Sequence, residues 1–260
     1  MTKVGFLGFG KMAMAIVRGW RTLPENQAPE VYAFAPNQEK LKRNCELLGA
    51  HPCASIDETV QNSDVLILAC KPKQVQSMVE EAYDGICNQF VICLAVGIDY
   101  DRLENWIPDV PHISILPNIA MAAAAGIVVV EKKNSLNLTQ RELFDQLISP
   151  LAYIADVEPD QFSIAGTIGG CSPAFLGLYA EALADAGVKY GLTRELAAAL
   201  SAQAIYGAGA LLVQEGKEPS VFKNEICSPG GTTIKGVVTL EKAGFRAAII
   251  EAIEAIQEKK

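Results

Sequence analysis

The first thirteen residues constrain the fold more than any other stretch of the sequence. The run Val-Gly-Phe-Leu at 4–7 has the composition of a short buried strand, and Gly-Phe-Gly-Lys-Met-Ala follows at 8–13. This is the pattern G-x-G-x-x-A placed between a strand and a helix. In that pattern the first glycine makes the tight turn, the second lets backbone approach a pyrophosphate, and the alanine allows close helix–strand packing. The helix N-terminus then faces the phosphates. We therefore expect a dinucleotide cofactor at Gly8, Phe9, Gly10, Lys11 and Met12.

Strand-like runs alternate with helical segments through the first half of the chain. The runs cover residues 4–7, 31–35, 65–70, 90–96, 112–116 and 127–131, and segments such as 12–21, 39–48 and 72–82 suit helices. Strands at this spacing, joined by helices, predict βαβ units and a parallel sheet that is covered on both faces. Thr139, with Glu142 as its capping-box partner, predicts a helix over 140–149. The expected fold class is α/β, with a Rossmann domain (a doubly wound, mainly parallel sheet) over residues 1–159.

From about residue 160 the strand signals stop and alanine becomes frequent. Pro173 is a candidate first residue of one helix, Thr193 a candidate N-cap of a second that runs to Gln214, and a third is expected from residue 228 to the C-terminus. The predicted second domain, 160–260, is all-helical. A helical domain this apolar cannot easily bury its apolar side chains in a monomer. This predicts homodimerisation through these helices.

Composition excludes several classes of protein. The 260 residues are 50% hydrophobic and 20% charged, which is typical of a globular chain, and a net charge of −8 without a basic stripe argues against nucleic acid. Seven cysteines occur without a CxxC pair, which favours a reducing compartment, and we expect the cytoplasm. Two histidines and no HExxH motif give no support to a metal site.

Two stretches need separate judgement as membrane or targeting segments. Lys11 and Arg18 interrupt the apolar N-terminus, which fits strand, turn and helix better than a signal peptide. Residues 196–214 carry no charge and are long enough to span a bilayer, but they are rich in alanine and include Ser201 and Gln203. A lipid-facing helix favours Leu, Ile and Phe. We expect no membrane span here, and a helix buried in protein between subunits.

The end of the second predicted strand bears on cofactor choice. A protein that holds the ribose of NAD usually has an acidic residue there. Here the strand ends in Ala35-Pro36-Asn37, and Lys40, Lys42 and Arg43 follow. Because an acid would repel a 2′-phosphate and Asn37 would not, we expect NADP(H) as the cofactor, with NAD as the alternative. Ligands in such sheets lie beyond the carboxyl ends of the strands, so further cofactor contacts are expected at Ala69, Cys70, Lys71, Pro72, Ala95, Gly97, Pro117 and Asn118.

Five segments together resemble the pyrroline-5-carboxylate reductase family. They are GFLGFGKMAMAI at the start, DVLILACKPKQV at 64–75, LPN at 116–118, EALADAGVKYGLTRELA at 181–197 and SPGGTTIKGVVTLE at 228–241. The last is the most specific, and order, spacing and length agree along the whole chain. The chain departs from the family pattern at GGCSPAF (169–175), at Ser114 where an arginine is usual, at Ile119-Ala120, and at Asn224.

The resemblance implies an NAD(P)H-dependent reductase that converts the cyclic imine 1-pyrroline-5-carboxylate to L-proline, the last step of proline biosynthesis. It also implies a Rossmann domain followed by a helical dimerisation domain, with dimers that commonly assemble further into decamers. The departures keep two alternatives open: a drifted paralogue that reduces another imine or keto acid, and a non-catalytic NADPH-binding regulator. A β-hydroxyacid dehydrogenase fits less well, because the chain from residue 169 has no lysine until Lys189.

The reaction needs hydride delivery to the imine carbon, a held carboxylate and a partner for the ring nitrogen. A threonine hydroxyl can donate or accept, so it can serve that nitrogen in either protonation state. Thr233 is our choice, in line with the resemblance, although the residues alone leave Thr232 open, and one of the two is also expected to cap the following helix. Backbone N–H groups at a helix N-terminus suit a carboxylate. The predicted substrate-binding residues are Ser228, Gly230, Gly231, Thr232, Thr233 and Ser172.

Overall fold

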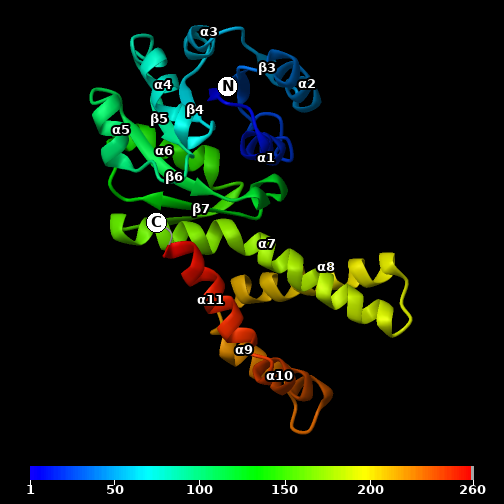
Figure 1. Cartoon of the computed structure of the whole chain (residues 1–260). Coiled ribbons are helices and arrows are strands. Elements are labelled where there is room, and N and C mark those ends of the chain that lie inside the picture. The colour runs from blue at the N-terminus through cyan, green and yellow to red at the C-terminus, as the bar shows by residue number, and fades with distance from the viewer. Residues whose placement is uncertain (259–260) are drawn as a thin grey trace. The chain divides into compact units, whose positions relative to one another are not determined.

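The computed structural model describes residues 1–258 of the chain (Figure 1). These residues form two compact units, Met1–Cys171 and the chain from Ser172 onward, with the division inside one long helix. Unit 1 holds all the strands of the sheet, and unit 2 is helical throughout.

Unit 1 is built on one eight-stranded sheet in the order β3-β2-β1-β4-β5-β6-β7-β8. The first six strands in this order, from β3 across β1 to β6, run parallel to one another. The strand β7 is antiparallel to β6, and β8 is parallel to β7. After β1 the chain adds β2 and β3 on one side and β4 on the other, which makes the carboxyl end of β1 a topological switch point. The expected α/β fold class with a mainly parallel sheet is confirmed. The strands are β1 Lys3–Leu7, β2 Glu30–Phe34, β3 His51–Pro52, β4 Val65–Leu68, β5 Phe90–Cys93, β6 His112–Pro117, β7 Gly126–Glu131 and β8 Ala152–Val157.

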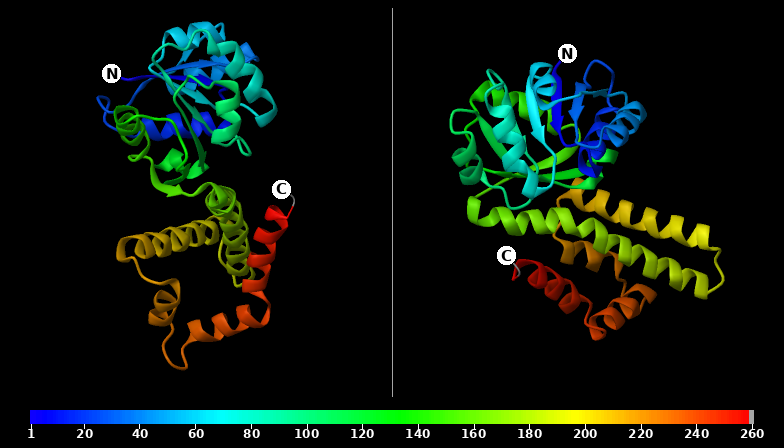
Figure 2. Two further views of the ribbon diagram at one scale, coloured as in Figure 1. Left: turned by 90° about the vertical axis from the view of Figure 1, so that its left-hand side faces the viewer. Right: turned by 45° about the horizontal axis from the view of Figure 1, so that its top comes forward.

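Helices cover both faces of this sheet, as the two further views show (Figure 2). One face packs against α1 Lys11–Trp20, α2 Gln38–Leu48 and α6 Leu138–Ile148. The other packs against α3 Ile56–Gln61, α4 Pro72–Tyr83 and α5 Tyr100–Trp106. Fully buried large side chains such as Phe6 and Phe144 anchor the first layer, and each stabilises the fold by about 1.5–3 kcal/mol. This rigid core fixes the strand ends where the candidate site lies.

Two strands were not predicted, and two were predicted too long. The strand β3 has only two residues and is too short to give a pattern. The edge strand β8, AYIADV, begins with four apolar residues, and this signal was missed. The strands expected over 65–70 and 90–96 end earlier, at Leu68 and Cys93. The residues that follow them are loops, and these loops carry predicted cofactor contacts.

The start of α6 differs from the prediction. Asn137, rather than Thr139, is the N-cap: its Oδ1 accepts a bond from the Gln140 N–H at 2.9 Å. The Gln140 side chain accepts in return from the Asn137 N–H at 3.0 Å. This capping box lies two residues before the predicted one, because Asn-x-x-Gln satisfies the same pattern as Thr-x-x-Glu.

The helices from residue 159 onward confirm one predicted boundary and correct two. Thr193 is the N-cap of α8, and its side chain accepts from the Leu196 N–H at 3.3 Å. Pro173 does not begin a helix, because it lies inside α7. The expected single C-terminal helix is wrong as well: a separate α9 precedes it, and Gly244, at φ 78°, separates α10 from α11. The helices are α7 Pro159–Lys189, α8 Arg194–Glu215, α9 Pro219–Ile226, α10 Thr232–Lys242 and α11 Phe245–Gln257.

The apolar helix α8 is largely exposed in the single chain. Among the described residues it is the one helix long and apolar enough to cross a membrane, on length and composition alone. Only 11% of its apolar window is buried. Large exposed side chains on it include Leu196, Leu200 and Leu211. The prediction that this helix is buried between subunits therefore concerns a second copy of the chain, and it stays a prediction.

Candidate active site

The turn after β1 shows why glycine stands at position 8. Gly8 has φ 97°, in the left-handed region, and a Cβ there would lie 2.7 Å from the Cys70 nitrogen and 2.8 Å from the Ala69 carbonyl. No side chain fits that space. The Gly8 N–H donates to the Phe34 carbonyl at 2.8 Å, so the turn is held between the ends of β2 and β4. The predicted tight turn is therefore set by backbone contact with two neighbouring strand ends.

The next residues differ in what they can offer a ligand. Gly10 is the N-cap of α1 without a side-chain cap, and a Cβ on it would meet nothing within 4 Å. The first N–H groups of α1 therefore open onto free space, as a pyrophosphate site requires. The Phe9 side chain is buried in the core beside Phe6, and Met12 packs against the same core. Phe9 can therefore present only backbone to a cofactor, whereas Met12 is partly exposed and Lys11 is exposed.

The ends of β4 and β5 place two more predicted segments at the same edge of the sheet. After Leu68 the chain passes through Ala69 and Cys70 to Lys71, the N-cap of α4, and Pro72 takes the first helical position. Beyond β5 the Ile98 N–H bonds to the Ala95 carbonyl at 3.1 Å. Gly97 closes that turn at φ 81°, with open space where a Cβ would lie. Because the carboxyl ends of parallel strands share one edge, both loops lie at the edge that carries the Gly8 turn, the β4 loop next to it and the β5 loop one strand further along.

The end of β6 places Asn118 inside the fold. Its side chain is 5% exposed and makes three hydrogen bonds. The Oδ1 atom accepts from the N–H groups of Ala120 at 3.2 Å and Ile127 at 3.1 Å. The Nδ2 atom donates to the Gly169 carbonyl at 2.9 Å. Asn118 and Pro117 therefore stand at the predicted strand end, but the Asn118 amide is already committed to the protein.

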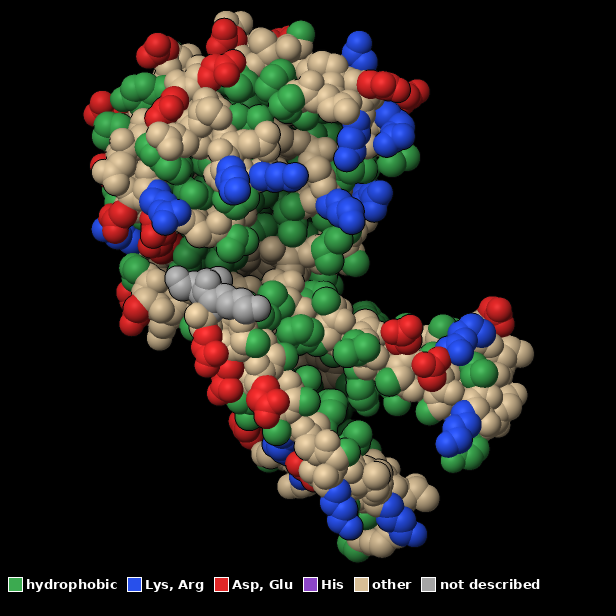
Figure 3. All heavy atoms as spheres, viewed as in Figure 1, with side chains coloured by type: hydrophobic (Ala, Val, Ile, Leu, Met, Phe, Trp, Pro, Cys, Tyr) green, Lys and Arg blue, Asp and Glu red, His purple; other side chains and the backbone are tan. Residues whose placement is uncertain are grey.

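Exposed polar and cationic groups lie at the end of β2. Asn37 is the N-cap of α2, and its Oδ1 accepts from the Lys40 N–H at 2.9 Å. Lys40, Lys42 and Arg43 are exposed on that helix. In the space-filling view lysine and arginine side chains gather on unit 1 over the region of α1 and α2 (Figure 3). This part of an acidic protein can therefore receive an anion.

The cysteines near the strand ends are not activated. Burial raises the pKa of the Cys70 thiol to about 11 and that of Cys93 to about 12. Both stay protonated at neutral pH, whereas a nucleophilic cysteine needs the thiolate. Their role is therefore packing. The described residues contain no group of three or more side chains suited to a metal ion.

The SPGGTT segment in unit 2 forms the start of α10. Gly231 is the N-cap and has no side-chain cap hydrogen bond, so the expectation that a threonine caps this helix is wrong. Thr232 and Thr233 are instead its first two residues, and both are exposed. Gly230 turns the chain at φ 69°, and a Cβ on Gly231 would lie 2.5 Å from the Ser228 Oγ. Neither threonine hydroxyl therefore caps the helix, and no side chain of the N-cap residue accepts from the first N–H groups of α10. Ser172 lies apart from this segment in the sequence, inside α7.

Two residues that hold the Gly97 turn were missed from the sequence. Arg102 donates from Nη1 to the Gly97 carbonyl at 2.6 Å. Glu131, at the end of β7, accepts from the Tyr100 N–H at 2.8 Å. Neither residue belongs to a motif. The Glu131 bond depends on how β7 packs against α5, and the Arg102 bond depends on the conformation of the turn five residues before it, so neither has a signature in the sequence.

Curated relatives and solved structures match over almost the whole chain. A Treponema pallidum protein named pyrroline-5-carboxylate reductase is 39% identical, over 97% of this chain and 97% of its own length. An Arabidopsis thaliana protein of the same name is 33% identical, over 99% of this chain and 94% of its own length. A pyrroline carboxylate reductase of Plasmodium falciparum, solved with NADP bound, superposes with a TM-score of 0.86 at 26% identity, over 99% of this chain and 96% of that one.

The sheet, its switch point and the open glycine turn define unit 1 as a dinucleotide-binding Rossmann domain. Residues 3–97 match the family described as "NADP oxidoreductase coenzyme F420-dependent", and residues 159–260 match "Pyrroline-5-carboxylate reductase dimerisation". The chain belongs to the pyrroline-5-carboxylate reductase family. The resemblance noted from the sequence is confirmed.

Proposed function

We propose that this protein reduces 1-pyrroline-5-carboxylate to L-proline with NAD(P)H, the last step of proline biosynthesis. The observation that carries the proposal is the uncapped start of α10 at Gly230-Gly231-Thr232-Thr233, in a chain of this family. It combines free N–H groups, which suit a carboxylate, with a hydroxyl next to them. The open turn at Gly8 and Gly10 supplies the separate requirement, a place for the cofactor.

The proposed reaction makes little use of acidic or basic side chains of the protein. A bound nicotinamide supplies the hydride to the imine carbon, and the ring nitrogen takes up a proton from solvent, which yields the secondary amine of proline. The N–H groups at the start of α10 hold the carboxylate and so fix which face of the ring is presented. The Thr233 hydroxyl bonds the ring nitrogen and, with Thr232, completes the subsite to which Ser228 and Ser172 are also assigned.

NADPH is the proposed cofactor, with NADH as the poorer substitute. The 2′-phosphate of NADPH falls at the end of the second strand in Rossmann domains. Asn37 there is neutral, and Lys40, Lys42 and Arg43 are exposed on the helix that it caps. The NADP bound in the Plasmodium falciparum structure and the match of residues 3–97 to an NADP oxidoreductase family support this choice.

The working form is proposed to be a homodimer in the cytoplasm, with further assembly to a decamer. The support is the match of residues 159–260 to a dimerisation family and the exposed apolar side chains of α7, α8 and α11. Every one of the seven cysteines is a free thiol, which fits a reducing compartment. Residues 1–159 and 160–260 are the proposed cofactor-binding and dimerisation domains.

Steady-state rates with three substrates test the proposal. NADPH is offered with pyrroline-5-carboxylate, with the six-membered imine acid and with a 2-keto acid, and NADH is offered with the first. We expect the five-membered imine with NADPH to give the highest kcat/KM. A preference for another substrate would identify a drifted paralogue. Tight NADPH binding without turnover of any substrate would identify a regulator.

A further inference from the structure

The turn at Gly97 is a loop whose shape depends on its neighbours. Its residues 94–99 connect β5 to α5, and Val96 at its tip is 58% exposed. Gly97 adopts φ 81° and makes no close packing contact where a Cβ would lie. Leu94, Ala95 and Ile98 are buried, and the Ile98 N–H bonds to the Ala95 carbonyl, so only the exposed tip at Val96 and Gly97 depends on hydrogen bonds from outside the loop. Two side chains supply them.

Arg102 holds the turn from within α5. Its Nη1 donates to the Gly97 carbonyl at 2.6 Å, and this charge-assisted bond spans five residues. The backbone of Arg102 is fixed in turn, because its N–H donates to Asp99 Oδ1 at 3.0 Å. Asp99 is the N-cap of α5, so hydrogen bonds join the Gly97 turn to the first turn of the helix.

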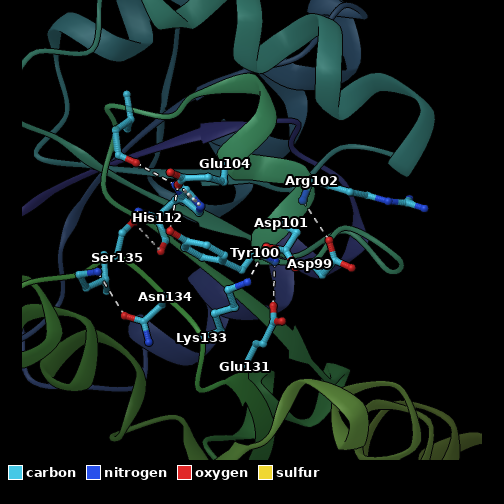
Figure 4. A network of polar contacts seen from close by, with 12 residues as sticks. Asp99, Tyr100, Asp101, Arg102, Glu104, His112, Glu131, Lys133, Asn134 and Ser135 are labelled. Carbon is cyan, nitrogen blue, oxygen red and sulfur yellow. Dashed lines mark hydrogen bonds and ion pairs between the residues drawn. The ribbon is translucent and has the colours of Figure 1, made fainter.

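Glu131 attaches the start of α5 to β7, the strand that runs antiparallel to β6. It lies at the end of β7, is 3% exposed, and its Oε2 accepts from the Tyr100 N–H at 2.8 Å. Figure 4 shows Glu131 pointing to the backbone at the start of α5, beside Asp99 and Lys133. Burying a carboxylate costs free energy even when a backbone N–H is its partner. Here that partner is the N–H of Tyr100, the residue that directly follows the turn.

The Tyr100 side chain adds a second attachment to the same point. Its hydroxyl donates to Glu104 Oε2 at 3.0 Å, and its ring stacks on buried His112 at 4.7 Å between centroids. The Lys133 Nζ atom lies over the same ring, 5.1 Å from its centroid. Figure 4 shows these side chains converging from α5, β6 and the segment after β7. Tyr100 is therefore held in place by its side-chain contacts, and the exposed Gly97 turn lies just before it in the chain.

We propose that Arg102 and Glu131 are positioning residues for the cofactor: they hold the Gly97 turn in the shape that accepts the dinucleotide, without contacting it. This rests on the proposed function, because it takes the Gly97 turn as part of the cofactor site. Without either bond the turn samples other conformations, and NADPH binding must restore the productive one. The apparent affinity for NADPH then equals the intrinsic affinity multiplied by the fraction of the protein whose turn is in the competent conformation.

The experiment compares NADPH binding and kinetics in three variants with the wild type. Arg102→Met and Glu131→Ala each remove one bond, and Glu131→Gln keeps an acceptor for the Tyr100 N–H. We expect the first two to raise the Kd and the KM for NADPH by about three- to tenfold, the worth of one net hydrogen bond. The KM for the imine and kcat change less, and Glu131→Gln restores near wild-type affinity.

Arg141→Met is the matched control. Arg141 also makes side-chain contacts within unit 1, to Asp156 of β8 at 2.8 Å and, inside α6, to Asp145 at 3.0 Å. Its loss should lower the Tm without changing the Kd. If Arg102→Met and Glu131→Ala behave like this control, with a lower Tm and an unchanged Kd for NADPH, the inference is overturned. Failure of the wild type to bind NADPH would instead overturn the proposed function.

Discussion

The Asn118 side chain donates a hydrogen bond to the carbonyl of Gly169 inside helix α7, at 2.9 Å. In an uninterrupted helix that carbonyl accepts from the N–H four residues later, which is position 173. Position 173 is proline, which has no N–H. Asn118 therefore supplies the donor that Pro173 lacks. The end of β6 is tied to α7 at the point where the helix ladder is broken.

This relationship predicts energetic coupling between two residues. Asn118→Ala should lower the free energy of unfolding by about 1–3 kcal/mol, because buried backbone groups lose their partners. In a Pro173→Ala background the Gly169 carbonyl regains a helix donor, so the same substitution should cost about 1 kcal/mol less. Urea denaturation of the four proteins in the cycle measures the coupling. Strictly additive effects would show that the two positions act independently.

Cofactor preference should change at Asn37 without loss of the helix cap. Asn37→Asp keeps an N-cap of equal quality for α2 but adds a negative charge at the end of β2. We expect the KM for NADPH to rise about tenfold and that for NADH to change little, because only NADPH carries the 2′-phosphate. The neutral cap Asn37→Ser is the control and should stay within about twofold of wild type for both. Equal losses for both cofactors would contradict the assignment.

Stability should depend on pH through Glu131. Burial raises the pKa of this carboxyl, with Asp99 and Asp101 adding to the effect, while the Tyr100 N–H and Lys133 oppose it. The folded state then binds the proton more readily than the unfolded state does, so stability falls as pH rises from the ordinary glutamate range through the raised pKa. Glu131→Gln should remove that decrease. The Tm of both proteins across this range measures it, and parallel curves would refute the prediction.

The sequence predicted what depends on local pattern and missed what depends on packing. The Gly8 turn and the Thr193 cap follow from residue types at fixed spacing, and both are in place. Pro173 was misplaced, because tertiary support from Asn118 lets a proline stand inside a helix. The bond from Glu131 to the start of α5 joins segments far apart in the chain and has no signature. The cap of α10 was assigned to a threonine, whereas Gly231 holds that position and leaves the hydroxyls free.

Dimerisation should depend on the apolar face of α8. Leu200 is 53% exposed on this helix in the single chain. A glutamate there would have to be desolvated in a dimer interface, so Leu200→Glu should shift the protein from dimer or larger to monomer. Sedimentation velocity reports the change, with Leu138→Glu as the control, because Leu138 is an exposed residue of unit 1. A compact wild-type monomer would reject the dimer.

Turnover should depend on one threonine of α10. Thr233→Ala should reduce kcat by about a hundredfold, because the ring nitrogen loses its hydrogen-bonding partner. Thr233→Ser keeps the hydroxyl and should retain most activity. Thr232→Ala, at the neighbouring exposed position of the same helix, is the comparison and should lower kcat less, because Thr232 belongs to the substrate subsite but is not the proposed partner of the ring nitrogen. NADPH affinity and Tm should stay unchanged in all three. A larger loss in Thr232→Ala than in Thr233→Ala would transfer the role to Thr232.

The most direct test of the central claim is the stoichiometry of product to cofactor with the wild-type protein. Purified protein is incubated with pyrroline-5-carboxylate and limiting NADPH, and the NADPH consumed is compared with the L-proline formed by chiral chromatography. The account predicts one L-proline for each NADPH oxidised and no D-proline. NADPH that stays reduced although the protein binds it, or is oxidised without proline appearing, would contradict it.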